Sequence, residues 1–218
     1  MFIFSWLSDF MTNALVFIHG LVGNYGLSII LFTLIIKLLL YPLTAKQTRS
    51  MKEMQELQPE IKKLQDKYKD NKEKQQEEMM DLYKKHNINP AAGCLPMILQ
   101  LIILIPLYRS ILAMGPTMQN STFLWIGTLT SGSLAEPDVA IVILNAIVMI
   151  GQTYLTQKMS GSGQKGNMMM WIMPLFIVFI GFQLPAGVLL YWFTSTLFTV
   201  VQQYILANEP SKIKEAAE

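Results

Sequence analysis

Cysteine and histidine are almost absent from this chain of 218 residues. The single cysteine, Cys94, excludes a disulfide within the chain, and His19 and His86 add too few ligands for a metal centre. No GxxxxGK(S/T) phosphate loop occurs, so a nucleotide-driven mechanism lacks its usual motif. We therefore predict that the protein uses no metal, no cofactor and no nucleotide.

Charged residues are also few, because Asp, Glu, Lys and Arg together make up 15% of the chain. Hydrophobic residues make up 52%, and the mean hydropathy of +0.36 is typical of an integral membrane protein. Five apolar runs are long enough, or nearly so, to cross a bilayer as helices. We predict an all-α integral membrane protein with five transmembrane helices. They fall at residues 23–43, 91–112, 138–157, 169–183 and 186–207.

Lysine and arginine are unevenly distributed among the segments that connect these runs. Residues 1–25 and 113–137 contain none, whereas residues 44–90 contain eleven of the seventeen. The loop 158–168 and the tail 208–218 contain two each. Because positive residues gather on the cytoplasmic side of a membrane, the 113–137 loop is predicted to be outside and the basic segments inside. The N-terminus is then outside and the C-terminus inside, as five crossings require.

Residues 1–22 precede the first predicted span and could be mistaken for a signal peptide. They lack a positively charged start and a small-residue cleavage site, so we interpret them as mature sequence. Polar and apolar residues alternate at helical spacing, which predicts an amphipathic helix in the outer membrane interface; the alternative is a frayed terminus. The polar set is Ser5, Ser8, Asp9, Thr12 and Asn13, opposite Phe2, Ile3, Trp6, Phe10 and Ala14.

Residues 44–90 form one substantial polar segment, with eleven basic and nine acidic residues. Apolar residues recur within it at helical spacing, first over 51–68 and again over 79–83. A turn around Asp70 would join two antiparallel arms, so we predict a cytoplasmic helical hairpin. Its apolar residues would pack the two arms together, or would offer a flexible, methionine-rich surface to apolar partners. The candidates for this surface are Met51, Met54, Leu57, Met79 and Met80.

Lys37 stands inside the otherwise uncharged apolar run 26–43. A lysine at mid-bilayer costs about 2.5–3.5 kcal/mol on insertion scales, so such a residue normally faces water or a polar partner within the protein. Thr33 and Tyr41 lie four residues to either side and therefore share its helix face. We interpret Lys37 as part of a functional site; the alternative is that its side chain only reaches toward the nearer headgroups.

Further polar residues lie within the other predicted spans, several of them in the half of the membrane that holds Lys37. They would line one cavity with Lys37, or would serve only as hydrogen-bonding links worth about 0.6 kcal/mol each. No acidic residue lies within the five spans except Asp138 at an outer boundary, so we expect the partner of Lys37 to be water or a transient anionic group. These polar residues are Gln100, Asn145, Gln152, Ser195, Thr199 and Gln202.

Several long motifs, in order along nearly the whole chain, resemble the YidC/Oxa family of membrane-protein insertases. The resemblance implies a five-helix core, a cytoplasmic hairpin, and a water-filled groove open to the cytoplasm and to lipid. The motifs are Tyr25-Gly-Leu-Ser-Ile-Ile through Pro42-Leu-Thr, Met54-Gln-Glu-Leu-Gln-Pro-Glu-Ile-Lys-Lys-Leu-Gln-Asp-Lys-Tyr68, Asn89-Pro-Ala-Ala-Gly-Cys-Leu-Pro-Met-Ile-Leu-Gln100, Leu184-Pro-Ala-Gly-Val-Leu-Leu-Tyr-Trp-Phe-Thr-Ser195, and Gln202-Gln203.

By this resemblance, Lys37 stands where the family has a basic groove residue that attracts acidic residues of a client. That residue is usually arginine, and lysine keeps the charge without the planar five-donor fork. Gln152 matches the groove glutamine of the third span, and Trp192 matches the tryptophan of the last span. The resemblance also implies a bacterial cytoplasmic membrane location, newly made membrane proteins as clients, the Sec translocon and ribosome as further partners, a monomeric working unit, and no nucleic-acid recognition.

Two other classes of protein would also place polar residues in a membrane. A channel or transporter for ions or solutes needs a pathway to both faces, often with paired internal repeats, and none is visible among the five spans. An intramembrane hydrolase needs a base beside its nucleophile, yet neither histidine falls within a span that holds Cys94 or Ser195. We therefore predict an insertase rather than an enzyme, with the channel or transporter as the alternative.

Overall fold

The structure is a computed structural model that describes residues 2–86, 88, 95–119, 121–126, 133–160, 172, 175 and 178–208. The described residues form helices and no strand, with a single isolated bridge between Phe123 and Ile126. The predicted all-α class is confirmed. Cys94, almost all of the predicted 158–168 loop and 208–218 tail, and much of the predicted 169–183 span lie outside the described residues.

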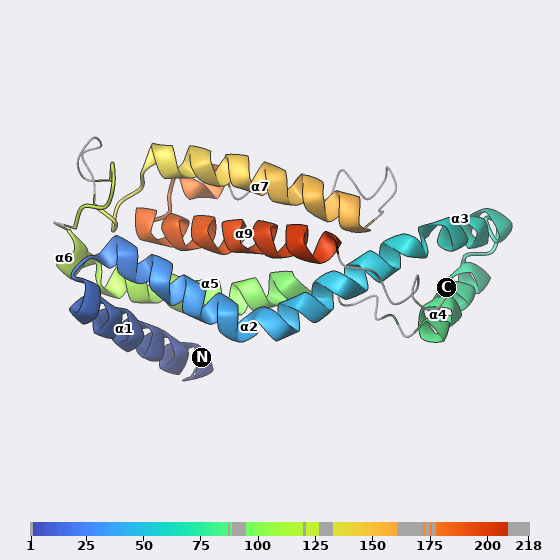
Figure 1. The fold of residues 1–218 in the computed structure, drawn as a ribbon, viewed down its shortest axis with the longest axis horizontal. Helices are drawn as coiled ribbons and strands as arrows, with labels where there is room; N and C mark the ends of the chain where they lie inside the picture. Colours follow the sequence, from blue (N-terminus) through green and yellow to red (C-terminus); the bar gives the residue numbers. More distant parts are fainter. Residues whose placement is uncertain are drawn as a thin grey trace.

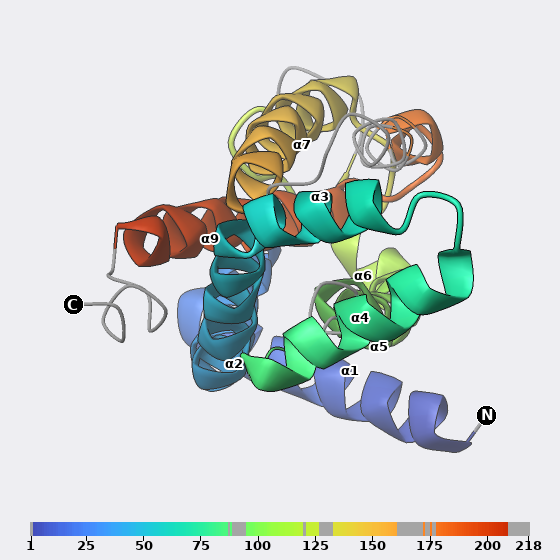
Figure 2. The same ribbon diagram turned by 90° about the vertical axis from the view of Figure 1, so that its right-hand side faces the viewer.

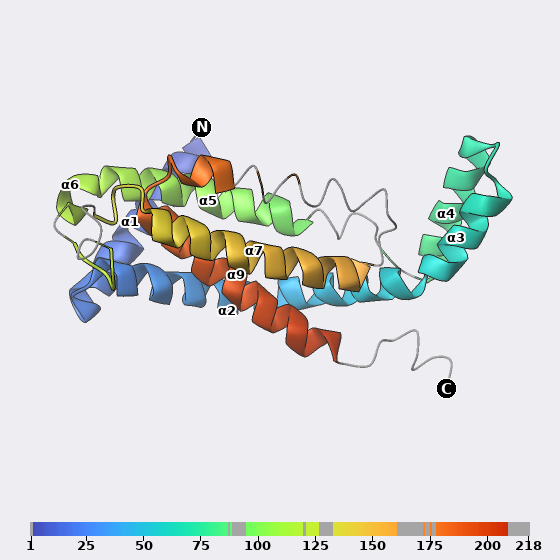
Figure 3. The same cartoon turned by 90° about the horizontal axis from the view of Figure 1, so that it is seen from above.

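Helices α2, α5, α7 and α9 run lengthwise through the molecule and make up the bundle (Figures 1 and 3). At one end two shorter helices project as a hairpin, and at the other end lie a one-turn helix and the described parts of the connecting segment, residues 121–126 and 133–138. We call these the hairpin end and the loop end. The helices are α1 Phe2–Val22, α2 Tyr25–Glu56, α3 Gln58–Lys67, α4 Lys72–Lys85, α5 Leu95–Ala113, α6 Gly115–Met118, α7 Val139–Ser160 and α9 Ala186–Ala207.

Helix α2 is a single rod of 32 residues, about 48 Å long, which exceeds the hydrocarbon thickness of a bilayer by a wide margin. Asn24 starts it, because the Asn24 side chain accepts a hydrogen bond from the Leu27 amide at 3.0 Å. Pro42 lies inside α2 without ending it. The sequence-based boundary at residues 43 and 44 therefore marks a change of composition and not the end of a helix.

Helix α9 lies between α2 and α7 and packs closely against both (Figure 1). Its first turns are the most buried part of the bundle, with Leu189 and Tyr191 almost wholly enclosed. They belong to one buried apolar cluster with Ile29 of α2 and Ile111 of α5. The apolar core of the protein therefore lies toward the loop end.

Glycine is required where α2 meets the connecting segment at the loop end. A Cβ atom added to Gly26 would overlap the side chain of Phe123. The absence of a side chain at Gly26 lets the aromatic ring lie directly on the helix backbone. This close contact holds the 121–126 segment against the start of α2.

The hairpin begins at Leu57, the residue between the end of α2 and the start of α3. Pro59 falls in the first turn of α3, where the missing amide proton does not interrupt a helical hydrogen bond. The turn over 68–70 leads to Asn71, whose side chain accepts a hydrogen bond from the Lys74 amide and starts α4. Leu57, Ile61, Tyr83 and Ile88 form a small core of their own. Figure 2 shows α3 and α4 lying across the end of the bundle.

Helix α1 packs obliquely against α5 and α2 (Figure 1). The Ser110 hydroxyl of α5 donates to the Ser8 carbonyl at 2.8 Å, and the side chains of Met11 and Leu15 of α1 are buried. The outward side of α1 carries both polar and apolar residues, among them Asp9 and Phe10. By length and composition, two helices of the described chain could cross a membrane, over Tyr25–Glu56 and Val139–Lys158.

Candidate functional site

Lys37 lies on α2 and points to α9. Its Nζ donates a hydrogen bond to the Thr199 hydroxyl oxygen at 3.0 Å, and its side chain is half-buried. Within the described part of the chain, this ammonium group forms no ion pair. A cation held by one neutral hydroxyl keeps most of its capacity to attract an anion.

Two further contacts join α2 to α9 on the hairpin side of Lys37. The Gln202 side chain donates to the Thr44 hydroxyl oxygen at 2.8 Å. The Lys52 ammonium donates to the Ala207 carbonyl at 2.6 Å, at the last residue of α9. A lysine at the C-terminus of a helix is favourable, because it satisfies an unpaired carbonyl and complements the helix dipole.

Gln100 of α5 makes side-chain hydrogen bonds to two residues of α9. Its amide nitrogen donates to the Tyr191 hydroxyl at 3.3 Å, and its amide oxygen accepts from the Ser195 hydroxyl at 3.3 Å. Tyr191 and Ser195 are buried, one helical turn apart on α9. These bonds join α5 to α9 next to the Lys37 contact.

Helix α7 completes the polar contacts of α9. The Gln203 side chain donates to the Thr156 hydroxyl at 3.3 Å. Side-chain hydrogen bonds therefore link α9 to α2, α5 and α7 between Tyr191 and its end. This stretch takes up about three quarters of α9 and includes its end nearer the hairpin. We call the residues of these contacts the polar cluster: Tyr191, Ser195, Thr199, Gln202 and Gln203 of α9, with Lys37, Thr44, Gln100 and Thr156.

Other predicted site residues lie apart from these contacts. The Asn145 side chain donates to the Ile141 and Leu189 carbonyls at 2.9 and 3.0 Å, which fastens α7 to α9 nearer the loop end. Thr33 is wholly buried and bonds to the Ile29 carbonyl of its own helix. Trp192 and Gln152 are half-buried, and Tyr41 is exposed. The structure therefore does not bring all ten predicted residues into one set of contacts.

The residues predicted to form the client-binding surface of the hairpin differ in their exposure. Leu57 is only 1% exposed and lies in the hairpin core, with Met54 and Met79 packed against it. Met80 is 47% exposed, and Met51 is half-buried on α2. In this conformation Leu57 holds the arms together, and Met80 is the member of the set that an apolar partner can reach.

Sequence reasoning missed the role of Lys52, because its acceptor is a backbone carbonyl and no side-chain pattern marks it. Thr44 and Tyr191 could be predicted from helical periodicity, because Thr44 shares the helix face of Lys37 and Tyr191 precedes Ser195 by one helical turn. Helical periodicity predicted which residues share a face, but it does not predict which helix lies opposite.

The polar cluster contains one cation, hydroxyls and amides, and none of the hydrogen bonds described above involves a carboxylate. Such a set can hydrate and attract an anionic segment, whereas acid–base catalysis would require titratable pairs. The fold and the site define a helical membrane protein with a cationic polar cluster in one half of its bundle.

Comparison with known proteins narrows this class. A family model described as 60Kd inner membrane protein matches residues 17–214. The membrane protein insertase YidC of Fusobacterium nucleatum is 40% identical over 212 residues, covering 95% of this chain and 98% of its own. The YidC of Caldanaerobacter subterraneus is 42% identical over 208 residues, covering 95% and 97%. The chain belongs to the 60Kd inner membrane protein family, in which these relatives are YidC insertases.

A solved structure supports the same assignment. The crystal structure of an active YidC insertase with its first transmembrane domain resolved is similar with a TM-score of 0.74 and 31% identity. The match covers 92% of this chain and 46% of that one. The family resemblance predicted from the motifs is confirmed, and the insertase function is supported over the channel or transporter.

Proposed function

We propose that this chain inserts membrane proteins by passing a short hydrophilic segment of the client through a groove lined by the polar cluster. The observation that carries the proposal is Lys37, a cation in an apolar span whose ammonium bonds to Thr199 and to no acidic residue of the described chain. The names of the relatives supply the class of activity.

The proposal includes five spans, with the N-terminus outside and the C-terminus in the cytoplasm of a bacterial cell. The distribution of lysine and arginine supports this orientation, since the 113–137 segment has none and the hairpin segment has eleven. The loop end then faces outward and the hairpin end faces the cytoplasm. In this orientation the polar cluster lies in the cytoplasmic half of the bundle and the apolar core closes the outer half.

Insertion is physical and needs no bond chemistry. The client's hydrophilic segment enters from the cytoplasm, where hydroxyls, amides and the Lys37 ammonium replace part of its hydration and lower the free-energy cost of leaving water. Its apolar segment then moves sideways into lipid, favoured by about 25 cal/mol for each Å² of apolar surface buried. Acidic residues in the client strengthen the first step by attraction to Lys37.

The hairpin is proposed to make the first contact with clients. Exposed Met80 supports this role, because methionine adapts to apolar surfaces of different shape. We propose that one chain forms the complete groove and that the surrounding lipid receives the client. The Sec translocon and the ribosome are proposed as additional partners for clients that the groove does not handle alone.

The test is insertion of a short, Sec-independent client with an acidic outer segment into liposomes that contain the purified protein. Lys37→Arg should retain insertion, Lys37→Ala should reduce it severalfold, and Lys37→Glu should reduce it more than tenfold. Lys46→Glu is the matched control, because Lys46 is exposed on the same helix, nine residues toward the hairpin. It changes the net charge equally and should leave insertion nearly unchanged.

Equal activity of all three Lys37 variants would refute the electrostatic role. A client with a neutral outer segment sharpens the test, since its insertion should depend less on the charge at residue 37. Ion conductance through the purified protein in a planar bilayer, without client insertion, would favour the channel.

A further inference from the structure

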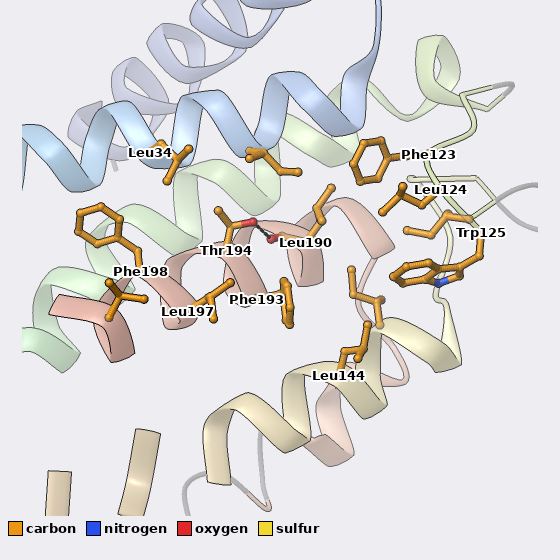
Figure 4. Close-up of a pocket in the computed structure, with 14 residues that line it drawn as sticks. Leu34, Phe123, Leu124, Trp125, Leu144, Leu190, Phe193, Thr194, Leu197 and Phe198 are labelled. Carbon is orange, nitrogen blue, oxygen red and sulfur yellow. Dashed lines mark hydrogen bonds between the residues drawn. The ribbon is translucent and has the colours of Figure 1, made fainter. Parts of the chain in front are cut away.

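An apolar cavity of about 420 Å³ lies on the face of α9 turned away from the polar cluster (Figure 4). Leu197 and Val201 lie in its floor, each about 200° around the helix from Thr199, the acceptor of Lys37. Leu34 of α2 and Leu144 of α7 form the two sides. The cavity is therefore separate from the proposed groove.

The lining offers almost no polar group to a ligand. Thr194 contributes the one side-chain hydroxyl, and this group donates to the Leu190 carbonyl of its own helix at 2.8 Å, as Figure 4 shows. The floor is also open to the surroundings, because Leu197 is 44% exposed and Val201 is 51% exposed. In a bilayer the surroundings of an outward-facing apolar surface at this depth are acyl chains.

The volume and length of the cavity indicate which apolar ligand it could hold. An apolar cavity of about 150 Å³ holds benzene, so about 420 Å³ holds roughly sixteen carbon atoms at the same density. A helix about 10 Å across would fill that volume in roughly one turn, so a client span does not fit. From Leu190 to Val201 the floor runs about 16 Å along α9, close to half of a hydrocarbon core about 30 Å thick.

The end of the cavity at the loop end is aromatic. Phe123 and Trp125 close it there, and the Trp125 indole nitrogen donates to Asp138 at 3.3 Å. Tryptophan is enriched at the level of the lipid headgroups. A ligand that enters from this leaflet would have its polar end near Trp125 and its apolar part along α9.

We propose that this cavity binds one acyl chain of a phospholipid from the leaflet at the loop end. The lipid fills the space between α2 and α7 behind α9, which packs the back of the helix whose front carries the polar cluster. This site goes beyond the proposed insertion function and rests only on the protein's residence in a bilayer.

Native mass spectrometry tests the proposal. The full chain is reconstituted in vesicles of phosphatidylethanolamine and phosphatidylglycerol, extracted in mild detergent, and stripped stepwise of loosely held lipid. We expect one phospholipid per chain to resist stripping. Leu144→Trp, which fills the cavity from α7, should lower its retention more than tenfold. Ile143→Trp is the matched control, because Ile143 is 54% exposed on the same helix and does not line the cavity; it should retain the lipid.

A second measurement follows the tryptophan at the cavity end. In a variant whose other tryptophans, Trp6, Trp171 and Trp192, are phenylalanine, phospholipids brominated on the acyl chain should quench Trp125 fluorescence. Thr194→Phe, which fills the cavity from α9, should reduce that quenching and provides a second route if Leu144→Trp fails to fold.

Equal lipid retention and equal quenching in the filled and control variants would overturn the proposal. So would a retained mass that belongs to a peptide or a second copy of the chain. Neither measurement uses client insertion, so a negative result would overturn the lipid-binding proposal without bearing on the proposed insertion function.

Discussion

The loop end and the hairpin end of the bundle are held together by different kinds of contact. At the loop end, the Ala186 and Gly187 amides of α9 each donate to a backbone carbonyl of the connecting segment at 2.8 Å, and Asp138 caps α7. At the hairpin end, single side-chain hydrogen bonds join α9 to its neighbours. Backbone contacts and close apolar packing define one arrangement, whereas long polar side chains can exchange partners with water or a client.

We therefore expect the loop end to contribute most of the stability of the bundle, and the hairpin end to be the more adaptable part. Four substitutions test this division, and each is expected to change the free energy of unfolding by a different amount.

Gly26→Ala should have the largest effect on stability. The added methyl group overlaps Phe123, so the 121–126 segment or α2 must shift, and overpacking of this kind costs about 1–3 kcal/mol. Unfolding of the detergent-solubilised protein should show a lower midpoint. Gly151→Ala is the control, because a Cβ atom at Gly151 meets nothing within 4 Å. Similar stability of the two variants would contradict the close packing.

Asp138→Ala should come second. Asp138 accepts from the Ile141 amide at 3.0 Å and from the Trp125 side chain at 3.3 Å, so the variant loses the cap of α7 and a link to the connecting segment. Loss of a helix cap costs about 0.5–2 kcal/mol. Asp138→Asn retains an acceptor oxygen and should recover most of the stability in the same unfolding assay. A larger loss for Asn than for Ala would exclude the capping role.

Thr44→Val should have a smaller effect, because it removes one side-chain hydrogen bond at the hairpin end. The Gln202 amide loses its acceptor, at an expected cost of about 0.6 kcal/mol. Thr194→Val is the control, since that hydroxyl donates to the Leu190 carbonyl of its own helix. A loss from Thr44→Val as large as that from Gly26→Ala would refute the division between the two ends.

Tyr83→Phe should be nearly neutral at pH 7 and matter only in alkaline solution. Burial in the hairpin core raises the pKa of the Tyr83 hydroxyl above its ordinary value of 10.0. The unfolded hairpin therefore releases the Tyr83 proton at a lower pH than the folded one, and stability falls as the pH rises above about 10. Thermal unfolding at increasing pH should show this loss in the natural protein, and the Phe variant should lack that part of it.

Much of the architecture could be predicted from apolar runs and helical periodicity. The all-helical class followed from composition, and the family followed from long motifs such as the one around Trp192. The continuity of α2 could not be inferred, because a proline and a rise in charge at residues 42–46 are typical of a helix boundary, whereas α2 continues through both. Residues 115–118 were predicted as loop, since a helix of one turn leaves too short a pattern to detect.

The candidate site was only partly predictable for a related reason. Lys37, Thr199 and Gln202 stood out because polar residues are rare in apolar spans. Asn145 stood out equally, yet it bonds to backbone carbonyls of α7 and α9. Residue type and depth identify polar residues within a membrane, but they do not separate a group that fastens two helices from one that remains accessible to a client.

Because α2 is one continuous helix, it connects the hairpin directly to Lys37. The same helix carries Lys37 and, nineteen residues later, ends at the hairpin core, with no loop between them to absorb movement. Under the proposed function, a client that moves α3 and α4 would therefore also move the part of α2 that carries Lys37. Pro42 is the position at which α2 bends most easily, because proline leaves one helical hydrogen bond unmade. Pro42→Ala would therefore couple the movement of the hairpin to that of Lys37 more tightly.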